Sequence, residues 1–418
     1  MRRNESFKSH QAKDFKKLIM NIPPFVALEV GTKRTVVLVG EVNDSGQMVV
    51  TGRGEHVSSG VKKGRIVDFD YAVIGVQEAL KAAAENSGTD IGAVFIAANG
   101  DFVNVISRPG STKIHNHTVS QDDIDDVNAV AMDCELPQNT TVMHSLARNY
   151  RIDDQHGVVK PIGLKGSVLS LELLLVTANE GPIENFRNVA NAASVDVEDF
   201  VFSPLAAAQA VLTPQLKRAG VAVIDLGAGT TNYIAYVDGV PASIGSLAVG
   251  GDYVTGDIMH AFNVPENSAE ELKLNHGKAI VDGGGQRIPL PRSFVMRDRT
   301  IGLKSLRTVI NARMDETLRI IKSKFVRDDV LVRLGAGIVF TGGAAAMPGL
   351  VELGNAIFGV PCTVGNKLNV IGLENVENAQ SYAVPAGLLI YGYKQWEQNY
   401  SHDSNSGFKK ILGRLFRR

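Results

Sequence analysis

Two stretches of the chain share one order of hydrophobic and polar positions. In each, an apolar run carries an acidic residue near its end, a glycine turn with hydroxyl side chains follows, and a second apolar run begins. The first copy covers residues 25–39 and the second covers residues 221–237. This order predicts a strand, a tight turn and a returning strand. Because the pattern occurs twice, we expect two related halves in one fold.

Hydrophobic spacing predicts the elements that follow the first hairpin. Residues 36–42 and 48–50 should form antiparallel strands. Residues 71–84 have helical spacing, and residues 94–98 have the composition of a short buried strand. These elements would complete one compact unit of strands and helix.

Residues 109–185 follow a different pattern. Ser120 should cap a helix that runs to about Ala131, because Asp122 and Asp123 occupy its first turn, where the helix dipole favours anions. Strand-like stretches come next, at 141–146, 148–152 and 167–177. This mixture predicts a small α+β insertion.

The rest of the chain alternates helical spacing with strands. Helical spacing over residues 183–212 is interrupted at 199–204, and a buried strand at 338–341 ends in two glycines. Further helices are expected at 268–275, 303–325, 349–358 and 382–391. The whole pattern predicts an α/β fold.

Composition narrows the functional classes. The chain has 418 residues, of which 44% are hydrophobic and 21% charged, as in soluble globular proteins. A net charge of -1 gives no overall field to attract nucleic acid, so we expect no nucleic-acid partner. Two distant cysteines support neither a disulfide framework nor a cysteine-based zinc site. No run is long enough to span a bilayer, and the basic stretch 1–24 lacks the apolar core of a secretion signal.

Four glycine-containing segments have the chemistry to hold phosphate. Glycine lets backbone N–H groups approach an anion closely, and threonine hydroxyls can donate to it. The acids of the two hairpins, Glu29 and Asp225, can hold a Mg²⁺ ion bound to that phosphate. The candidate nucleotide ligands are Gly31, Thr32, Lys33, Gly227, Gly229, Thr230, Thr231, Gly250, Gly251, Gly342, Gly343 and Ala344.

In their order along the chain, these segments resemble the phosphate-1, phosphate-2 and adenosine motifs of the actin and heat-shock-chaperone ATPase superfamily. Within it the chain resembles the FtsA family of bacterial cell-division proteins, in which a small subdomain interrupts the first half. The stretches that carry this resemblance are 161–166 with the following strand-like run 168–176, and 269–277, 336–345 and 381–388.

By position, the resemblance assigns Glu270 and Lys273 to contacts with the adenosine. Their spacing also places both side chains on one helix face, where they can pair with each other. An ordinary surface ion pair is therefore the alternative interpretation of these two residues.

The resemblance implies both a fold and a function. The fold would be an actin-like two-domain fold, with duplicated ribonuclease-H-like halves and a small α+β insertion in the first half. The ligands would be ATP and Mg²⁺, and ATP would favour self-association into homopolymers. The protein would assemble on the inner membrane face at the division site, anchor FtsZ (the Z ring) through residues 260–333, and recruit other division proteins.

The residue patterns and this resemblance together divide the chain into parts. They are a disordered basic arm at 1–24, a first half at 25–108 and 186–219, an inserted subdomain at 109–185, a second half at 220–259 and 334–393, its small subdomain at 260–333, a flexible linker at 394–406 and an amphipathic helix at 407–418.

Two departures from the superfamily pattern separate ATP binding from ATP hydrolysis. The phosphate-1 acid is usually aspartate, and the extra methylene of Glu29 moves its carboxylate enough to disturb Mg²⁺ geometry. Relatives that hydrolyse ATP often place Gln or Glu near the start of the connecting helix, where this chain has Ser203, with Gln209 farther along. We expect ATP binding with at most weak ATPase activity, and we assign no catalytic residue.

Two other functional classes stay open. A pilus-assembly actin homologue shares the insertion but typically has another partner and no basic tail. An ATP-hydrolysing sugar kinase or chaperone of the same superfamily would need a catalytic aspartate beside a sugar pocket, or a long C-terminal substrate domain. The sequence identifies neither feature.

The C-terminal stretch 407–418 has the pattern of an amphipathic helix, with apolar side chains on one stripe and basic side chains off it. Such a helix lies in a bilayer interface, where each basic residue near anionic lipid contributes about 1 kcal/mol. We predict peripheral, reversible membrane binding; a partner-binding helix or a helix packed on its own domain is the alternative. The candidate membrane-binding residues are Phe408, Lys409, Lys410, Ile411, Leu412, Arg414, Leu415, Phe416, Arg417 and Arg418.

Overall fold

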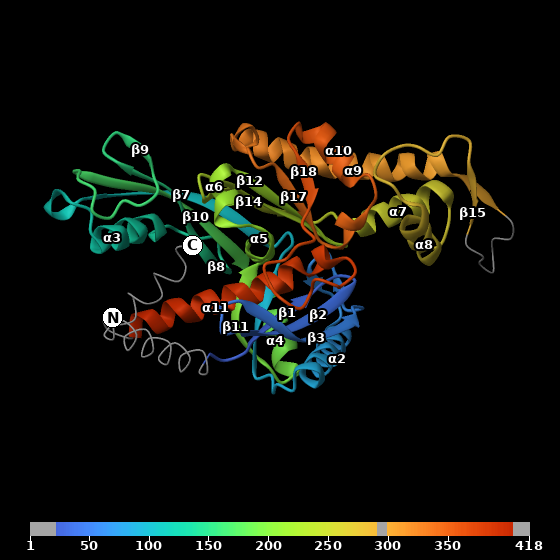
Figure 1. Cartoon of the computed structure of the whole chain (residues 1–418), viewed down its shortest axis with the longest axis horizontal. Helices are drawn as coiled ribbons and strands as arrows, with labels where there is room; N and C mark the ends of the chain where they lie inside the picture. The colour runs from blue at the N-terminus through green and yellow to red at the C-terminus, as the bar shows by residue number, and fades with distance from the viewer. Residues whose placement is uncertain (1–21, 291–298, 404–418) are drawn as a thin grey trace, which may run out of the picture.

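Two five-stranded sheets with the same topology form the centre of the computed structural model, which describes residues 22–290 and 299–403 (Figure 1). The first sheet has the order β11-β6-β1-β2-β3, and the second has the order β14-β13-β12-β17-β18. Their strands are β1 (Phe25–Val30), β2 (Arg34–Val42), β3 (Met48–Val57), β6 (Ala93–Ala98), β11 (Asp196–Phe202), β12 (Val221–Leu226), β13 (Thr231–Val237), β14 (Val240–Leu247), β17 (Ile338–Thr341) and β18 (Cys362–Val364). The predicted duplicated α/β halves are confirmed.

The two predicted hairpins occupy equivalent places in the two sheets. β1 pairs antiparallel with β2 and parallel with β6, and β12 pairs antiparallel with β13 and parallel with β17. Glu29 lies opposite Val36 and Asp225 lies opposite Asn232, each acid one residue before the end of its strand. Because β1 and β12 have neighbours on both sides and are covered on both faces, their apolar runs are continuous.

Helices cover both faces of the first sheet. On one face lie α2 (Phe69–Ser87) and α4 (Glu180–Ala192), which contact each other, and on the other lie α5 (Ser203–Val211) and α11 (Ala383–Asp403) (Figure 1). α2 begins where the Asp68 side chain accepts a hydrogen bond from the Tyr71 N–H, and it ends at Gly88 in the left-handed conformation. The short strands β4 (Val61–Lys62) and β5 (Arg65–Ile66) complete this half. The helix α6 (Pro214–Ala219), which the sequence assigned to this half, packs on β12 and β13 of the second half.

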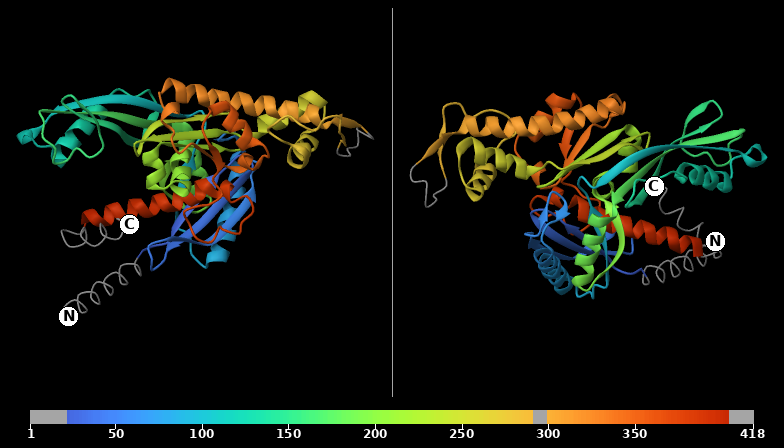
Figure 2. Two further views of the ribbon diagram at one scale, coloured as in Figure 1. Left: turned by 45° about the horizontal axis from the view of Figure 1, so that its top comes forward. Right: turned by 180° about the vertical axis from the view of Figure 1, so that it is seen from behind.

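The insertion forms its own four-stranded sheet and projects to one side of the two halves (Figures 1 and 2). The sheet has the order β7-β10-β8-β9, and its elements are β7 (Val103–Lys113), α3 (Gln121–Met132), β8 (Thr140–Ile152), β9 (Gln155–Val158) and β10 (Val168–Asn179). Ser120 and Asp123 form a capping box at the start of α3, as the predicted helix requires. β7 begins before the predicted boundary at residue 109, and the two strands predicted within 141–152 form the single strand β8.

A small subdomain extends from the second half, on the side opposite the insertion (Figure 1). The long helix α9 buries Leu306, Ile310, Leu318 and Ile321 along one face, which confirms the predicted helical spacing. The elements of this part are α7 (Gly251–Phe262), α8 (Glu266–His276), β15 (Arg287–Pro289), β16 (Thr300–Gly302) and α9 (Leu303–Arg327), followed in the second half by α10 (Leu350–Phe358). Short 3₁₀ turns occur at His115–His117, Leu331–Arg333, Gly343–Ala346 and Ala379–Tyr382.

The helical prediction for 183–212 allowed a break at 199–204, but it is wrong at residues 196–198, which belong to a strand. Residues 196–202 form β11, which pairs in parallel with β6 at the edge of the first sheet. Its last residues, Phe200, Val201 and Phe202, are buried. A strand partner that lies about a hundred residues earlier in the chain therefore overrides the local helical spacing.

The prediction of a flexible linker at 394–406 is wrong as far as Asp403, because α11 continues to that residue. The helix also packs on the first half, whereas the sequence assigned residues up to 393 to the second half. Tyr393 stacks on Trp396 and meets Phe25 edge to face, and Gln395 donates to Asp199 at 2.9 Å. These contacts pack the outer part of α11 on the first half, although its polar composition suited a linker as well as a helix.

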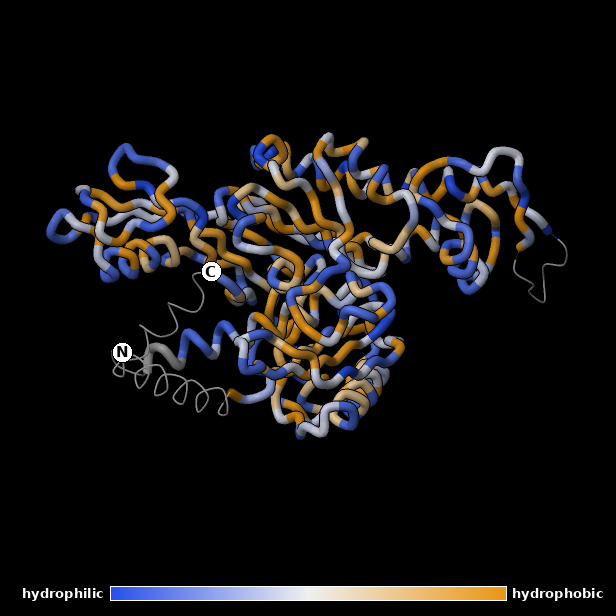
Figure 3. Tube along the Cα trace, in the orientation of Figure 1, coloured by the Kyte–Doolittle hydropathy of each residue, from blue (hydrophilic) through white to orange (hydrophobic). Residues whose placement is uncertain are grey.

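Hydrophobic positions gather in the strands of the two halves, and hydrophilic positions in the loops and along the outer part of α11 (Figure 3). Two predicted features lie outside the described residues. They are residues 1–21 of the basic arm, and residues 404–418 with the amphipathic tail.

His144 of β8 is a buried contact between the insertion and the first half. Its Nε2 accepts a hydrogen bond from the Phe202 N–H at 3.0 Å, and its ring meets the Tyr391 ring edge to face. Burial lowers the pKa of His144 to about 4, although the negative charge of Asp199 acts in the opposite direction. The folded protein therefore keeps this histidine neutral.

We expect the free energy of unfolding to fall as the pH drops from about 6.5 toward 4, because only the unfolded chain takes up a proton on His144 in that range. The variant His144→Gln should show a shallower fall, measured by urea denaturation across this range. His156→Gln, at an exposed position on β9, is the matched control and should follow the wild type. Equal pH slopes for wild type and His144→Gln would contradict the prediction.

Candidate nucleotide site

A cavity of about 660 Å³ lies between the two halves, where the carboxyl ends of β1 and β12 meet. Of the residues proposed from the sequence, those that line it are Glu29, Gly31, Thr32, Lys33, Asp225, Gly227, Gly229, Thr230, Gly251, Glu270, Lys273, Gly342, Gly343 and Ala344. Thr231 and Gly250 do not line it. Thr231 is buried and donates to the Val249 carbonyl at 2.8 Å, and Gly250 packs on the carbonyls of Gly227 and Ala228.

Glu29 and Asp225 reach this cavity from opposite halves. Burial raises the pKa of Glu29 to about 8, and the negative charge of Asp225 adds to that effect. Burial also raises the pKa of Asp225, against the hydrogen bonds donated by Asn232 at 3.3 Å and Thr341 at 3.1 Å. Two carboxylates that are held near each other away from water favour a proton or a cation between them.

The donor set fits a Mg²⁺ ion that is also bound to phosphate. Within residues 22–290 and 299–403, no group of three or more His, Cys, Asp or Glu side chains could hold a metal by itself. Glu29 and Asp225 supply two carboxylates, and Mg²⁺ usually takes one or two carboxylates and completes its shell with phosphate oxygens and water.

Two glycines allow the turns around the cavity to approach each other. A Cβ at Gly229 of the second half would lie 2.4 Å from the Thr32 hydroxyl and 3.0 Å from the Lys63 backbone of the first half. Gly342 has a φ of 86°, and a Cβ there would lie 2.4 Å from the Leu226 carbonyl. The first glycine closes the gap between the halves, and the second makes the turn after β17 possible.

Two lysines of the first half contact helices α7 and α8 of the second half beside the cavity. The Lys33 ammonium lies 3.4 Å from an Asp252 carboxylate oxygen and 3.6 Å from one of Glu266. Lys63 donates to the Tyr253 hydroxyl at 2.6 Å. These contacts join the halves across the opening, and they place the Lys33 charge where an anionic ligand would enter.

Glu270 and Lys273 form an ion pair in the wall of the cavity. Their charged atoms are 2.8 Å apart, and the Lys273 side chain is 10% exposed. Lys273 also donates to the Gly251 carbonyl at 3.2 Å and to the Thr255 hydroxyl at 2.8 Å. This burial argues against an ordinary surface ion pair, since both side chains are tied to the start of α7.

Asn99 is a cavity residue that the sequence reasoning missed. It accepts a hydrogen bond from the Thr230 hydroxyl at 3.3 Å across the two halves, and it donates to the Ser203 hydroxyl at 3.0 Å. Asn99 and Gly100 follow β6 in the first half, just as Gly342 and Gly343 follow β17 in the second. The internal repeat in the sequence could therefore have identified Asn99 as a cavity residue.

The two residues considered for orienting an attacking water have other roles here. The Ser203 hydroxyl donates to the Ala98 carbonyl at 3.1 Å and accepts from Asn99. Gln209 lies on a different cavity, where its side-chain oxygen accepts from Lys394 at 2.6 Å. Neither side chain is free to act at the phosphate turns.

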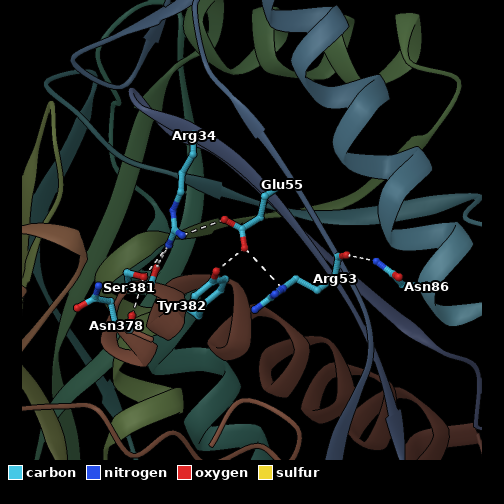
Figure 4. A network of polar contacts seen from close by, with 7 residues as sticks. All are labelled: Arg34, Arg53, Glu55, Asn86, Asn378, Ser381 and Tyr382. Carbon is cyan, nitrogen blue, oxygen red and sulfur yellow. Dashed lines mark hydrogen bonds and ion pairs between the residues drawn. The ribbon is translucent and has the colours of Figure 1, made fainter. Parts of the chain in front are cut away.

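Arg34, which also lines the cavity, anchors the start of α11 (Figure 4). Its guanidinium donates to the Ser381 carbonyl and hydroxyl, both at 2.8 Å, and to Glu55 at 3.1 Å. The Tyr382 hydroxyl donates to the same Glu55 carboxylate, and the Arg34 guanidinium lies 4.5 Å from the centre of the Tyr382 ring. We call Arg34, Glu55, Ser381 and Tyr382 the α11 anchor.

Known families match most of the chain. A family described as "Cell division protein FtsA" matches residues 222–387, and one described as "SHS2 domain inserted in FTSA" matches residues 100–177. The chain is 32% identical over 378 residues to the "Cell division protein FtsA" of Pseudomonas aeruginosa, which covers 90% of this chain and 91% of that relative. The match to the inserted domain agrees with the start of β7 at Val103.

Solved structures share the fold at low sequence identity. A "PilM-PilN type IV pilus biogenesis complex" superposes with a TM-score of 0.63 at 14% identity, covering 88% of this chain and 98% of that one. MreB 5 of Spiroplasma citri, bound to AMPPNP, superposes with a TM-score of 0.56 at 15% identity, covering 92% of this chain and 100% of that one. These similarities confirm the actin-like two-domain fold with its α+β insertion.

Replacing Gly229 by alanine should force the two halves apart, because the added carbon would meet Thr32 and the Lys63 backbone. We expect a loss of about 1–3 kcal/mol in the free energy of unfolding of the ligand-free protein, measured by urea denaturation. Gly343→Ala is the control, since nothing lies within 4 Å of a Cβ at that position. Equal stability of the two variants would show that Gly229 does not set the approach of the halves.

Proposed function

The chain belongs to the FtsA family of cell division proteins, and on that premise we propose that it binds ATP with Mg²⁺ between its halves as a conformational ligand. The observation that carries this proposal is the pair of equivalent hairpins whose glycine turns and carboxylates, Glu29 and Asp225, line one cavity. The AMPPNP bound to the similarly folded MreB 5 supports a nucleotide of this kind.

Each residue type in the cavity has a defined part in such binding. The turns at 31–33 and 227–230 would hold the phosphates through backbone N–H groups and threonine hydroxyls. Lys33 would exchange its carboxylate partners for phosphate oxygens. Glu270 and Lys273 would hold the adenosine beside Gly342 and the following residues. Mg²⁺ held by Glu29 and Asp225 would neutralise phosphate charge, which is the chemistry that it supplies when bound.

We expect ATP binding without efficient ATP hydrolysis, because the polar side chains considered for orienting water are bonded to other residues. Ser203 positions Asn99, and Gln209 is bonded to Lys394 at a different cavity. Phosphoryl transfer to water depends on a correctly placed residue that orients the attacking water. We therefore propose at most a weak ATPase activity, with no assigned catalytic residue.

We further propose that the protein assembles into homopolymers on the inner membrane face at the division site, as a peripheral membrane protein. The amphipathic pattern of residues 407–418 supports attachment through anionic lipid, and family membership supports FtsZ and other division proteins as partners. Within the described residues, no helix is long and apolar enough to cross a membrane. The small subdomain at 260–333 is the proposed FtsZ contact.

The likeness to a pilus-biogenesis complex makes an actin homologue of pilus assembly the second candidate. The identity of 14% to that complex is far below the 32% identity to an FtsA protein over most of its length. The third candidate is an actin-superfamily ATPase or kinase that hydrolyses ATP efficiently. Steady-state phosphate release, measured with lipid present, distinguishes such an enzyme from a binding adaptor.

Neutralising Asp225 should weaken nucleotide binding without unfolding the protein. Asp225→Asn removes one carboxylate from the proposed Mg²⁺ site and should raise the Kd for ATP with Mg²⁺ about tenfold or more, measured by calorimetry, since hydrogen bonds and contacts to charged groups are worth about 1.5–3 kcal/mol. The ligand-free variant should be no less stable, because burial already disfavours the charge. Asp238→Asn, at a surface ion pair with Arg333, is the matched control. Unchanged affinity in Asp225→Asn would refute the Mg²⁺ assignment.

The tail is tested by placing charges on its apolar stripe. Phe408→Glu with Leu415→Glu should release the protein from anionic vesicles in a co-sedimentation assay, because a buried apolar face cannot carry two carboxylates into lipid. Ser404→Glu with Ser406→Glu adds the same charge outside the stripe and should retain most binding. If both double variants sediment with vesicles as the wild type does, the tail is not the membrane anchor. The same assay with FtsZ added tests recruitment of that partner to lipid.

A further inference from the structure

A second cavity, separate from the nucleotide site, opens beside α11. Its volume is about 1540 Å³, and none of its lining residues lines the cavity between the hairpins. Its walls come from α11, from α6, from the turns at 46–48 and 238–239, and from the segment 366–374. Figure 1 shows α6 and the strands of the second half on one side of α11 and the blue strands of the first half on the other. The proposed nucleotide function makes no use of this space.

Four basic side chains line the second cavity: Lys217, Arg218, Lys367 and Lys394. Across residues 22–290 and 299–403, no carboxylate lies within ion-pair distance of any of them. Of the three acids in the lining, Asp238 is paired with Arg333 at 2.7 Å, and Glu374 accepts from the Gly372 N–H at 2.9 Å. Glu374 and Glu397 therefore oppose four cations, and the lining keeps an excess of positive charge.

Lys217 and Lys394 are two of these cations, and each has a neutral partner in the cavity wall. The Lys217 ammonium lies over the Tyr236 ring, 4.5 Å from its centre, and Lys394 donates to the Gln209 side chain at 2.6 Å. Burial lowers the pKa of Lys217 to about 8, and the positive charge of Lys394 adds to that effect. Desolvation of its ammonium end also lowers the pKa of Lys394. An anion between these groups would relieve both effects.

Apolar side chains form part of the same lining, so the cavity suits a ligand with both an anionic and an apolar part. Leu212, Val370, Ile390 and Tyr393 line it together with the lysines. α11 supplies one wall up to Gln398, roughly ten residues before Phe408, and ten residues of chain span at most about 35 Å. The cavity therefore lies within reach of any surface to which the tail is bound.

We propose that this cavity binds the phosphate headgroup of an anionic lipid, with Lys217 and Lys394 on the phosphate and the apolar wall against the adjoining glycerol and acyl carbons. Ammonium groups bind phosphate as point charges, and the apolar wall distinguishes a lipid phosphate from a free one. The proposal rests on the membrane attachment proposed above, because that attachment brings lipid to this face. It adds a second, specific lipid contact to the non-specific attraction of the basic tail.

The reactivity of the two lysines in the full-length wild-type protein tests the proposal directly. Acetylation by acetic anhydride, followed by mass spectrometry, reports the free-amine fraction of each lysine. Short-chain phosphatidylglycerol, kept below its micelle concentration, should slow labelling of Lys217 and Lys394 about tenfold, as a pKa rise of about one requires. Phosphatidylcholine of the same chain length and inorganic phosphate should slow it much less. Unchanged labelling would overturn the proposal. Protection by phosphate as strong as that by lipid, or protection by an acidic peptide alone, would overturn it too.

A binding measurement on variants gives an independent result. Lys217→Gln with Lys394→Gln should weaken binding of the short-chain phosphatidylglycerol about tenfold in calorimetry. Lys81→Gln with Lys304→Gln removes the same charge at exposed positions on α2 and α9 and should leave binding unchanged. Equal affinity of the two double variants would overturn the proposal.

The tail variant Phe408→Glu with Leu415→Glu separates this inference from the proposed function. Loss of vesicle binding together with lipid protection of Lys217 supports both the tail and the cavity. If this variant still binds vesicles while lipid protects Lys217 in the wild type, the tail is not the anchor and the cavity proposal is supported. If the tail variant loses vesicle binding but lipid does not protect Lys217 in the wild type, the tail is supported and only the cavity proposal is overturned.

Discussion

The placement of two carboxylates from opposite halves around one cavity is the constraint on which the site depends. Glu29 and Asp225 stand at equivalent positions of central strands, each one residue before the end of its strand. Burial raises the pKa of both, and the negative charge of Asp225 raises the pKa of Glu29 further. Two buried carboxylates are unfavourable in the empty protein, and a bound cation with its phosphates would make the same arrangement favourable. In the proposed function, this feature would make the site selective for a metal–phosphate ligand.

The cavity is joined mechanically to the helix that leads to the tail. Arg34 in the first half holds the Ser381 backbone, and the Gly342 N–H in the second half donates to the Gln380 carbonyl at 2.9 Å. The segment before α11 is thus tied to a nucleotide turn of each half. A change in the angle between the halves would move the start of α11 relative to one of them. If nucleotide binding changes that angle, it would therefore also move the start of α11.

Much of the fold could be predicted because its signals are local. The two hairpins, the capped helix α3 and the long helix α9 carry their patterns in consecutive residues. β11 and the outer part of α11 were missed because their partners lie far away in the sequence, in β6 and in the core of the first half. The site shows the same division. Its glycine turns were predictable, whereas the contact between Arg34 and Ser381 joins residues 347 positions apart and leaves no sequence pattern.

The central claim is that both halves hold one nucleotide, and hydrogen–deuterium exchange of the full chain with and without ATP and Mg²⁺ tests it most directly. The account predicts slower exchange at the turns 31–34, 227–231 and 342–346 together, with no change in the segment 366–374 at the second cavity. Protection confined to the turns of a single half would contradict it, because one hairpin alone would then suffice for binding.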